Sequence, residues 1–278
     1  MKKFCVIGDP VAHSKSPLIQ NTMMAALGFD GEYTYQTVKR DETTYWLERV
    51  RSEGWAGFNA TMPHKESLVA HMDELDEDAL LYGAINTVCY RNGKFYGYNT
   101  DGSGFARALK GANIPIKDTR FVLLGAGGAA KAVALKLVQQ DAGRVTICNR
   151  TAEKAAALVA HSPNTMSACG FSLPELTKVC SECDVLINCT NLGMNGSPDF
   201  ETLDFLYALP KGAPVCDLIY HPLETALLKR SKEQGHPVMN GLSLLIHQAI
   251  LALEHFTQTK IDAASMLPIV EAALAESS

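Results

Sequence analysis

The stretch Arg120-Phe-Val-Leu-Leu-Gly-Ala-Gly-Gly-Ala-Ala-Lys131 contains a short apolar run followed by a glycine-rich turn. Residues 120–124 have the length and branched side chains of a buried strand, and the alanine-rich residues 129–138 predict a helix directly after the turn. Gly125, Gly127 and Ala130 fit the G-x-G-x-x-G/A spacing, in which the first glycine allows a tight turn and the second lets the backbone approach a pyrophosphate. The phosphates would meet the unpaired N–H groups at the helix N-terminus. The stretch predicts a dinucleotide-binding unit, and a turn that serves packing alone is the alternative.

The next predicted strand, residues 144–148, ends in Asn149-Arg150-Thr151. In NAD-binding folds an acidic residue near this position holds the ribose 2′-hydroxyl, whereas an arginine suits a 2′-phosphate. No Asp or Glu stands at this strand end. Arg150 can bind a phosphate bidentately, Thr151 can donate a hydroxyl, and Lys154 lies one turn into the following helix. The pattern favours NADP over NAD, with a solvated Arg150 as the alternative.

Composition and charge narrow the class of protein. The 278 residues are enough for two domains, 47% of them are hydrophobic, and the net charge is −5. This mild acidity argues against nucleic acid as a partner, because nucleic-acid-binding proteins usually carry a basic face. No apolar run approaches the roughly 18 residues of a membrane span, and the N-terminus turns polar too soon for a signal peptide. We therefore expect no membrane partner and a cytoplasmic location.

The eight cysteines are scattered along the chain. Several lie in apolar, strand-like runs, where reduced and buried cysteines are found: Cys5, Cys148, Cys189 and Cys216. Cys180 and Cys183 form one C-x-x-C, but no second Cys or His pair at ligand spacing completes a zinc site. No H-E-x-x-H motif occurs either, so we expect chemistry that needs no metal.

The N-terminal part alternates predicted strands and helices. Ser16 and Pro17 predict the N-cap and first position of a helix, and Pro63 introduces a helix that carries Lys65. Asn92-Gly93 predicts a hairpin turn. Strands are expected at residues 4–8, 33–38, 57–61, 87–91 and 94–99, and a further helix at 42–53, closed by Gly54.

Near Thr100-Asp101-Gly102 the chain enters the glycine-rich part through a helix at residues 105–110. Strands are then expected at 185–190, 214–220 and 236–240, followed by helices at 242–256, which is apolar nearly all round, and at 262–276. The predicted fold is α/β with two domains. Because the last two helices follow a complete nucleotide-binding unit, we expect them to return to the first domain. Residues 1–101 plus 242–278 would bind the substrate, and residues 102–241 would form a Rossmann-type NADP-binding domain, with the active cleft between the two.

Polar residues recur where a purely structural explanation is strained. After the first predicted strand, the hydroxyls of Ser14 and Ser16 can donate hydrogen bonds to a carboxylate. Asn59 and Thr61 point the same way on one predicted strand, and they lead to Lys65. Further polar side chains stand where other strands or turns end: Asn86, Thr87, Asn99, Thr100 and Asp101. Gln248 lies inside an apolar helix, where a buried amide needs a hydrogen-bond partner. Beside a nucleotide site, such a set suggests a small polyhydroxylated acid as the substrate.

The sequence resembles the shikimate dehydrogenases. The resemblance covers nearly the whole chain in the family's order and rests on these motifs: His13-Ser-Lys-Ser-Pro17, Gly57-Phe-Asn-Ala-Thr-Met-Pro-His-Lys65, Gly83-Ala-Ile-Asn-Thr87, Tyr98-Asn-Thr-Asp-Gly102, Gly125-Ala-Gly-Gly-Ala129, Asn149-Arg-Thr151, Asn188-Cys-Thr-Asn-Leu-Gly-Met194, Asp217-Leu-Ile-Tyr-His-Pro222 and Gln248. It implies NADPH-dependent, reversible reduction of 3-dehydroshikimate to shikimate, a step in aromatic amino acid biosynthesis.

The resemblance also implies roles for individual residues. Lys65 and Asp101 look like the catalytic pair. The residues that look like substrate contacts are Ser14, Ser16, Asn59, Thr61, Asn86, Tyr220 and Gln248. Those that look like the surroundings of the cofactor are Glu77, Gly125, Ala126, Gly127, Gly128, Ala129, Asn149, Arg150, Thr151, Lys154, Thr190, Leu218 and Gly241. Hydride transfer to a ketone leaves negative charge on its oxygen. Lys65 is the cation that can stabilise this charge and deliver a proton, while Asp101 holds the ammonium group of Lys65 in place.

One motif departs from the family. Ser243-Leu244 stands where the family usually has Gly-Met, close to the nicotinamide, so packing and turnover there are expected to differ. The alternatives are a quinate or aminoshikimate dehydrogenase of the same family, a ligand-sensing regulator that keeps the fold without catalysis, and a Rossmann-type methyltransferase, which Arg150 disfavours. The protein is expected to be a monomer or a homodimer.

Overall fold

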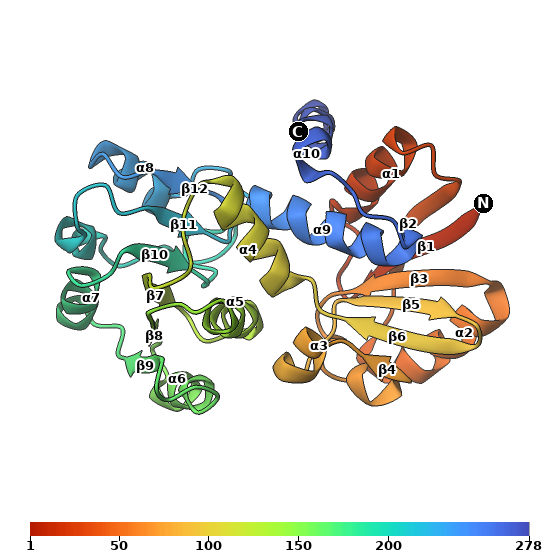
Figure 1. The fold of residues 1–278 in the computed structure, drawn as a ribbon, viewed down its shortest axis with the longest axis horizontal. Helices are drawn as coiled ribbons and strands as arrows, with labels where there is room; N and C mark the ends of the chain where they lie inside the picture. The colour runs from red at the N-terminus through yellow and green to blue at the C-terminus, as the bar shows by residue number, and fades with distance from the viewer. Residues whose placement is uncertain (278) are drawn as a thin grey trace. The chain divides into compact units, whose positions relative to one another are not determined.

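The computed structural model describes residues 1–277, and the chain divides into two compact units (Figure 1). The first unit comprises Met1–Thr100 and the residues from Ile246 onward, and the second comprises Asp101–Leu245. Each unit contains a six-stranded sheet, flanked by helices. The predicted α/β class is confirmed.

The sheet of the first unit has the strand order β2-β1-β3-β5-β6-β4 and is mixed. Its parallel part joins β1 to β2 and β3, whereas β5 is antiparallel to both β3 and β6. The elements are β1 (Lys2–Gly8), α1 (Ser16–Ala26), β2 (Gly31–Thr37), η1 (Arg40–Glu42), α2 (Thr43–Glu53), β3 (Trp55–Ala60), η2 (Val69–His71), β4 (Glu74–Leu75), α3 (Glu77–Tyr82), β5 (Thr87–Arg91), β6 (Lys94–Tyr98), α9 (Gly241–Thr257, from Ile246 onward) and α10 (Ala263–Glu276).

Local patterns account for much of this unit. The hairpin between β5 and β6 turns at Asn92 and Gly93, whose φ angles of 52° and 79° are those that an Asn-Gly turn supplies. Gly54 ends α2 with φ 74°, as expected for a helix C-terminus. The core under α2 is built from large apolar side chains such as Trp46, Phe58 and Phe95, all nearly inaccessible.

The predicted helix after Pro63 is wrong. Residues 62–68 form successive turns, with His64 N–H donating to the Thr61 carbonyl and Leu68 N–H to the His64 carbonyl. The Lys65 carbonyl instead accepts from Ile85 N–H at 2.8 Å. Val69 N–H, which an α-helix would direct to the Lys65 carbonyl, donates to the Glu66 carbonyl at 3.2 Å, so the helical bonding pattern is interrupted here.

Two predictions about where a helix begins and a strand ends are also wrong. Ser16 is the first residue of α1, not its N-cap; the cap position is Lys15, which makes no side-chain cap bond. The Ser14 hydroxyl accepts from Ser16 N–H at 3.2 Å and thereby takes over one of the unpaired donors of the helix start. Strand β3 ends at Ala60, which leaves Thr61 one residue beyond it.

The sheet of the second unit is parallel throughout and has the order β12-β11-β10-β7-β8-β9. Counted from its own first strand, this is the doubly wound order of dinucleotide-binding folds, so the Rossmann-type prediction is confirmed. Its elements are α4 (Asp101–Gly111), β7 (Arg120–Leu124), α5 (Gly128–Gln139), β8 (Arg144–Cys148), α6 (Ala152–Val159), β9 (Met166–Cys169), α7 (Leu173–Cys180), β10 (Val185–Asn188), η3 (Asp204–Ala208), β11 (Val215–Asp217), α8 (Ala226–Glu233), β12 (Val238–Met239) and the start of α9.

The strand order determines where this unit can bind a ligand. Strands β7 and β10 are neighbours, and the chain leaves them toward opposite sides of the sheet. The segments after these two strands therefore flank the switch point, where ligands of such sheets bind. The turn at 125–128 follows β7, and Thr190 follows β10.

Candidate active site

The predicted substrate residues of the first unit gather near the carboxyl ends of β1 and β3. Thr61 N–H donates to the Ile7 carbonyl at 3.0 Å, and its methyl group lies where a side chain on Gly8 would be. The Asn86 carbonyl accepts from Ala60 N–H at 2.9 Å, and the N–H of the preceding residue, Ile85, donates to the Lys65 carbonyl. The structure thus brings the backbone of Thr61, Lys65 and Asn86 into one region.

Asn59 is buried, and its amide is bonded within the protein. Its Oδ1 accepts from the Tyr33 hydroxyl at 2.6 Å, and its Nδ2 donates at 2.9 Å both to the Asn86 carbonyl and to Thr87 Oγ1. Both amide hydrogens are therefore used, and an Asn side chain has no others. Asn59 is better suited to hold its neighbours than to donate to a substrate.

A hydrogen-bond network continues from Asn86 toward α9. Asn86 Nδ2 donates to Thr100 Oγ1 at 3.0 Å, and Asn86 Oδ1 accepts from Thr100 N–H at the same distance. The Thr100 hydroxyl lies 3.5 Å from Gln248 Oε1. The amide of Gln248, half-buried in an apolar helix, therefore has a polar partner in the same unit.

Ser14 and Ser16 lie half-buried where the loop after β1 meets α1. Between them, Lys15 donates to Ser277 Oγ at 3.4 Å, which links this loop to the end of α10. Glu77 is exposed in the first turn of α3. Asp101, half-buried, is the first residue of α4, where the helix dipole stabilises a carboxylate.

The glycine turn after β7 has the geometry of a phosphate site. Gly125 adopts φ 107°, and a Cβ there would lie 3.0 Å from Thr190 Cγ2, so both backbone and packing require glycine. Gly127, by contrast, has extended backbone and caps α5, and a Cβ on Gly127 or Gly128 would meet no protein atom within 4 Å. Helix α5 has no acidic residue in its first turn. Its open N-terminus can therefore receive an anion.

The turn after β8 lies at the same edge of the sheet as the glycine turn after β7, and it presents two cations. Asn149 Nδ2 donates to the Thr151 carbonyl at 2.9 Å and so shapes the turn, while the other residues of the motif are exposed. Within residues 1–277, neither Arg150 nor Lys154 forms an ion pair. Arg150 also lines a groove of about 460 Å³, whose walls combine apolar side chains such as Phe171 with the acidic residues Asp199 and Glu201.

A buried carboxylate, Asp217, connects the segments that carry Thr190 and Leu218; it lies within one of the family motifs, but the sequence predicts no role for it. Asp217, 1% exposed, accepts from Asn188 Nδ2 and Ile219 N–H at 3.0 Å and from the Thr225 hydroxyl at 2.7 Å. Burial raises its pKa to about 6. A signal was present, because an acidic residue at the end of an apolar strand must be paired or functional. Gly241 packs against the Leu218 carbonyl, and its N–H donates to the Ile219 carbonyl at 2.9 Å. The exposed Tyr220 follows Ile219 in the chain.

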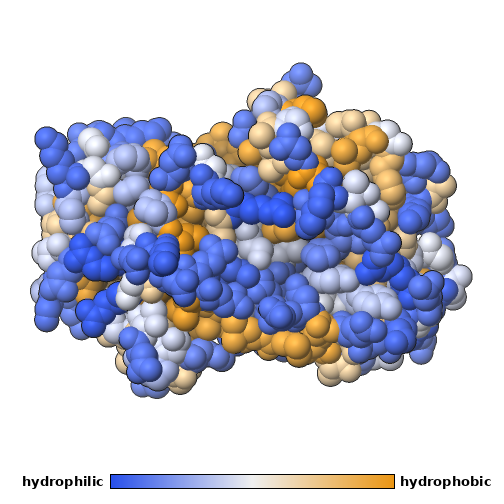
Figure 2. Space-filling view, viewed as in Figure 1, coloured by the Kyte–Doolittle hydropathy of each residue, from blue (hydrophilic) through white to orange (hydrophobic). Residues whose placement is uncertain are grey.

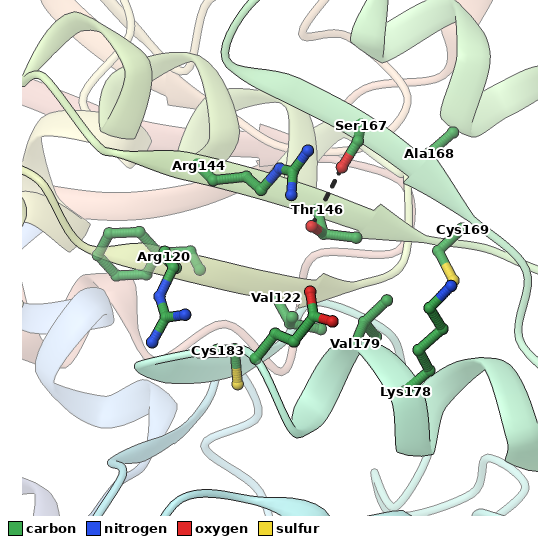
Figure 3. Close-up of a pocket in the computed structure, with 12 residues that line it drawn as sticks. Arg120, Val122, Arg144, Thr146, Ser167, Ala168, Cys169, Lys178, Val179 and Cys183 are labelled. Carbon is green, nitrogen blue, oxygen red and sulfur yellow. Dashed lines mark hydrogen bonds between the residues drawn. The ribbon is translucent and has the colours of Figure 1, made fainter.

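A separate cavity of about 340 Å³ lies at the other end of the same sheet, between β7–β9 and α7 (Figure 3). Figure 3 shows Arg120 and Arg144, the first residues of β7 and β8, beside the hydrogen-bonded Thr146 and Ser167. None of the predicted site residues lines it.

The Cys183 thiol donates to the Cys180 carbonyl at 3.4 Å, both residues are buried, and all eight cysteines are free. In the part of the chain that the structure describes, no group of three or more His, Cys, Asp or Glu side chains could hold a metal ion. Among these residues, no helix is both long and apolar enough to cross a bilayer. Hydrophilic residues cover most of the face shown in Figure 2, between separate apolar areas.

Comparisons with known proteins identify the family. Two family descriptions match, "Shikimate dehydrogenase substrate binding domain" over residues 6–88 and "Shikimate / quinate 5-dehydrogenase" over residues 107–194. The shikimate dehydrogenase (NADP(+)) of Geobacillus kaustophilus is 39% identical over 274 residues, which cover 98% of this chain and 99% of that protein.

Solved structures with a similar fold include shikimate dehydrogenases and another reductase. The Thermus thermophilus shikimate 5-dehydrogenase, crystallised in complex with NADP(H) and shikimate, is 34% identical, with a TM-score of 0.85 over 98% of this chain and 100% of that chain. A ligand-free 5-ketofructose reductase from a Gluconobacter strain is 32% identical, with a TM-score of 0.84 over 97% of this chain and 98% of that chain. The chain belongs to the shikimate dehydrogenase family.

Proposed function

We propose that this protein catalyses the reversible, NADPH-dependent reduction of 3-dehydroshikimate to shikimate. The observation that carries the proposal is the space over Gly127 and Gly128, together with the unpaired cations that follow β8. Neither packing nor backbone conformation requires glycine at these two positions, so a ligand that approaches the backbone explains them. Relatives 37–39% identical over most of the chain are NADP-dependent shikimate dehydrogenases.

The residues present fit NADP. The first N–H groups of α5 would bind the pyrophosphate, and Arg150 and Lys154 would bind the 2′-phosphate. The apolar side chains in the groove beside Arg150 would contact the adenine. No carboxylate of α5's first turn opposes the phosphates. When bound, NADPH supplies the hydride.

We propose Lys65 and Asp101 as the acid–base pair. Lys65 would stabilise the charge that develops on the substrate oxygen and deliver the proton, and Asp101 would orient the ammonium group and accept a substrate hydroxyl. The segment 61–68 suits this role because bonds to Ile7 and Ile85 hold both sides of it, which restricts where the lysine side chain starts. Ser14, Ser16, Thr61, Asn86, Tyr220 and Gln248 would contact the acid and its hydroxyls, with Asn59 holding Asn86 and Thr87 in place.

A direct assay tests the proposal. The loss of NADPH absorbance is followed with 3-dehydroshikimate, and the reverse reaction is followed with shikimate and NADP⁺. We expect kcat/KM with NADPH to exceed that with NADH by at least about tenfold, since losing the 2′-phosphate contacts forfeits more than about 1.4 kcal/mol. No turnover of either acid by the folded protein would refute the function, and equal use of both cofactors would refute the role of Arg150 and Lys154.

The likeness to a 5-ketofructose reductase favours one second candidate, reduction of another ketone that bears hydroxyl groups. The same assay separates the two, with 5-ketofructose, quinate and an amino analogue of shikimate offered beside shikimate. A kcat/KM for shikimate below that of any of these would replace the proposal. We further propose that residues 1–101 plus 242–278 serve the substrate, that residues 102–241 serve the cofactor, and that the protein is a monomer or a homodimer in the cytoplasm.

A further inference from the structure

Asp217 stands out in the second unit because it is a buried carboxylate without a basic partner. Its three hydrogen bonds come from an amide, a backbone N–H and a hydroxyl, and among residues 1–277 no cation pairs with it. The neighbouring titratable groups are the thiols of Cys189 and Cys216, and burial raises the pKa of both, that of Cys216 to about 12. An ionised group in such surroundings costs stability, so its presence calls for another explanation.

The carboxylate sets the orientation of Asn188. Because Asp217 Oδ1 only accepts, Asn188 must turn its Nδ2 toward it, and this leaves Asn188 Oδ1 facing Thr190. That oxygen accepts from Thr190 N–H at 3.0 Å and from the Thr190 hydroxyl at 2.6 Å. The position of Thr190, at the switch point of the sheet, therefore depends on Asp217 through one intermediate side chain.

The same carboxylate organises the segment after β11. Ile219 N–H donates to Oδ1, and the Ile219 carbonyl accepts from Gly241 N–H at 2.9 Å. Leu218 lies between, with its N–H bonded to the Asn188 carbonyl at 3.0 Å. Oδ2 accepts from Thr225, whose oxygen caps α8 by accepting from Leu228 N–H. One buried group thus connects the segments after β10 and β11 with the start of α8.

We propose that Asp217 is a positioning residue for the dinucleotide, which fixes Thr190 and the backbone at Leu218 and Gly241 through this network without touching the cofactor. The inference rests on the proposed function, because those three residues are the proposed surroundings of NADP. It gives a role to Asp217, which the sequence motif includes without one.

The test measures the Kd of NADPH by fluorescence titration of the full-length protein, which needs no catalytic turnover. Asp217→Asn keeps the shape but loses the charge and one acceptor, so we expect Kd to rise about tenfold at pH 8, the effect of one lost charged hydrogen bond. Thr225→Val removes the donor to Oδ2 and should raise Kd about threefold, whereas Thr225→Ser should restore the wild-type value. Asp184→Asn is the matched control, since it makes the same change at the amino end of β10, where Asp184 binds Arg120.

The pH dependence separates positioning from a merely structural role. As pH falls through about 6, the wild-type carboxyl gains a proton and comes to resemble the Asn variant. The ratio of the two Kd values should therefore fall from about ten at pH 8 to below about two at pH 5. The 2′-phosphate of NADPH also titrates near pH 6, at about the same value, but it does so in both proteins and cancels in the ratio.

Several results would overturn the proposal. One is a wild-type Kd in folded Asp217→Asn, and another is a ratio that does not change with pH. If Asp217→Asn does not fold, an unchanged Kd in folded Thr225→Val overturns it. The proposed function fails separately, when the wild-type protein binds NADPH but does not reduce 3-dehydroshikimate.

Discussion

The burial of Asp217 makes the stability of the second unit depend on pH. Its pKa in the folded protein is about 6, whereas the ordinary value is 3.8. The difference of about 2 units, at about 1.36 kcal/mol each, corresponds to a penalty of about 3 kcal/mol when the group is ionised in the folded state. The side chain is 1% exposed, so solvent screens little of this.

The sign follows from proton binding. Between about pH 4 and pH 6 the folded state holds a proton on Asp217 that the unfolded state has released, so the folded state binds more protons. Stability from this group is therefore highest below about pH 4, falls as the pH rises through this window, and stays low above about pH 6. Asp217→Asn has no such proton, so its free energy of unfolding should lack this slope.

Urea unfolding of both proteins at several pH values measures the effect. Relative to Asp217→Asn, the wild-type protein should lose about 2 kcal/mol of unfolding free energy between about pH 4.5 and about pH 7.5, because part of the penalty is already present at the lower pH. Far-UV circular dichroism follows the whole chain, whereas Trp46 and Trp55, the two tryptophans, lie in the first unit and report on it. Parallel pH profiles for the two proteins would refute the reasoning, and so would a wild-type protein that gains stability relative to the variant over this range.

Four further substitutions have defined outcomes. Lys65→Ala should lower kcat about 10²- to 10⁴-fold with a much smaller change in KM for shikimate, as steady-state kinetics would show, and near-normal turnover would end its assignment as the acid. Arg150→Ala should raise KM for NADPH far more than KM for the substrate; equal effects in the same assay would contradict binding of the 2′-phosphate. Gly127→Ala should leave the melting temperature unchanged, because its Cβ meets no protein atom, yet weaken NADPH about tenfold or more in a binding titration. Tyr33→Phe leaves Asn59 Oδ1 without its 2.6 Å donor and should cost about 1–3 kcal/mol in urea unfolding followed by tryptophan fluorescence.

Features encoded by neighbouring residues could be predicted from the sequence. The strand, turn and helix around Gly125 and the hairpin at Asn92-Gly93 depend on local conformational preferences, and both form as expected. The alternation of strands and helices predicted the Rossmann-type class of the second unit, and its parallel sheet confirms that class. The short elements β4, α3 and β9 were not predicted, because two to six residues carry too little periodic pattern.

Features that depend on distant partners could not be predicted. In the turn that carries Lys65, the lysine carbonyl accepts from Ile85, twenty residues later, and not from Val69, as it would in a helix. The amide of Asn59 looked available for a substrate, but Tyr33 and Thr87 occupy it. In both cases the residue types and their spacing were compatible with either outcome, and only the packing of the sheet decides between them.

The glycines of the Gly125 turn show how structure can separate two requirements that a motif combines. A positive φ and close contact with Thr190 make glycine necessary at position 125 for the fold itself. At positions 127 and 128 neither condition holds, since the backbone suits any residue and the space beyond each Cα is open. Glycine loses more conformational entropy on folding than other residues, so a glycine that the fold does not require is explained by a ligand that binds there. The open side of this turn therefore identifies the ligand-facing part of the motif, and it predicts that substitutions at Gly125 and Gly127 will fail differently, the first in stability and the second in binding.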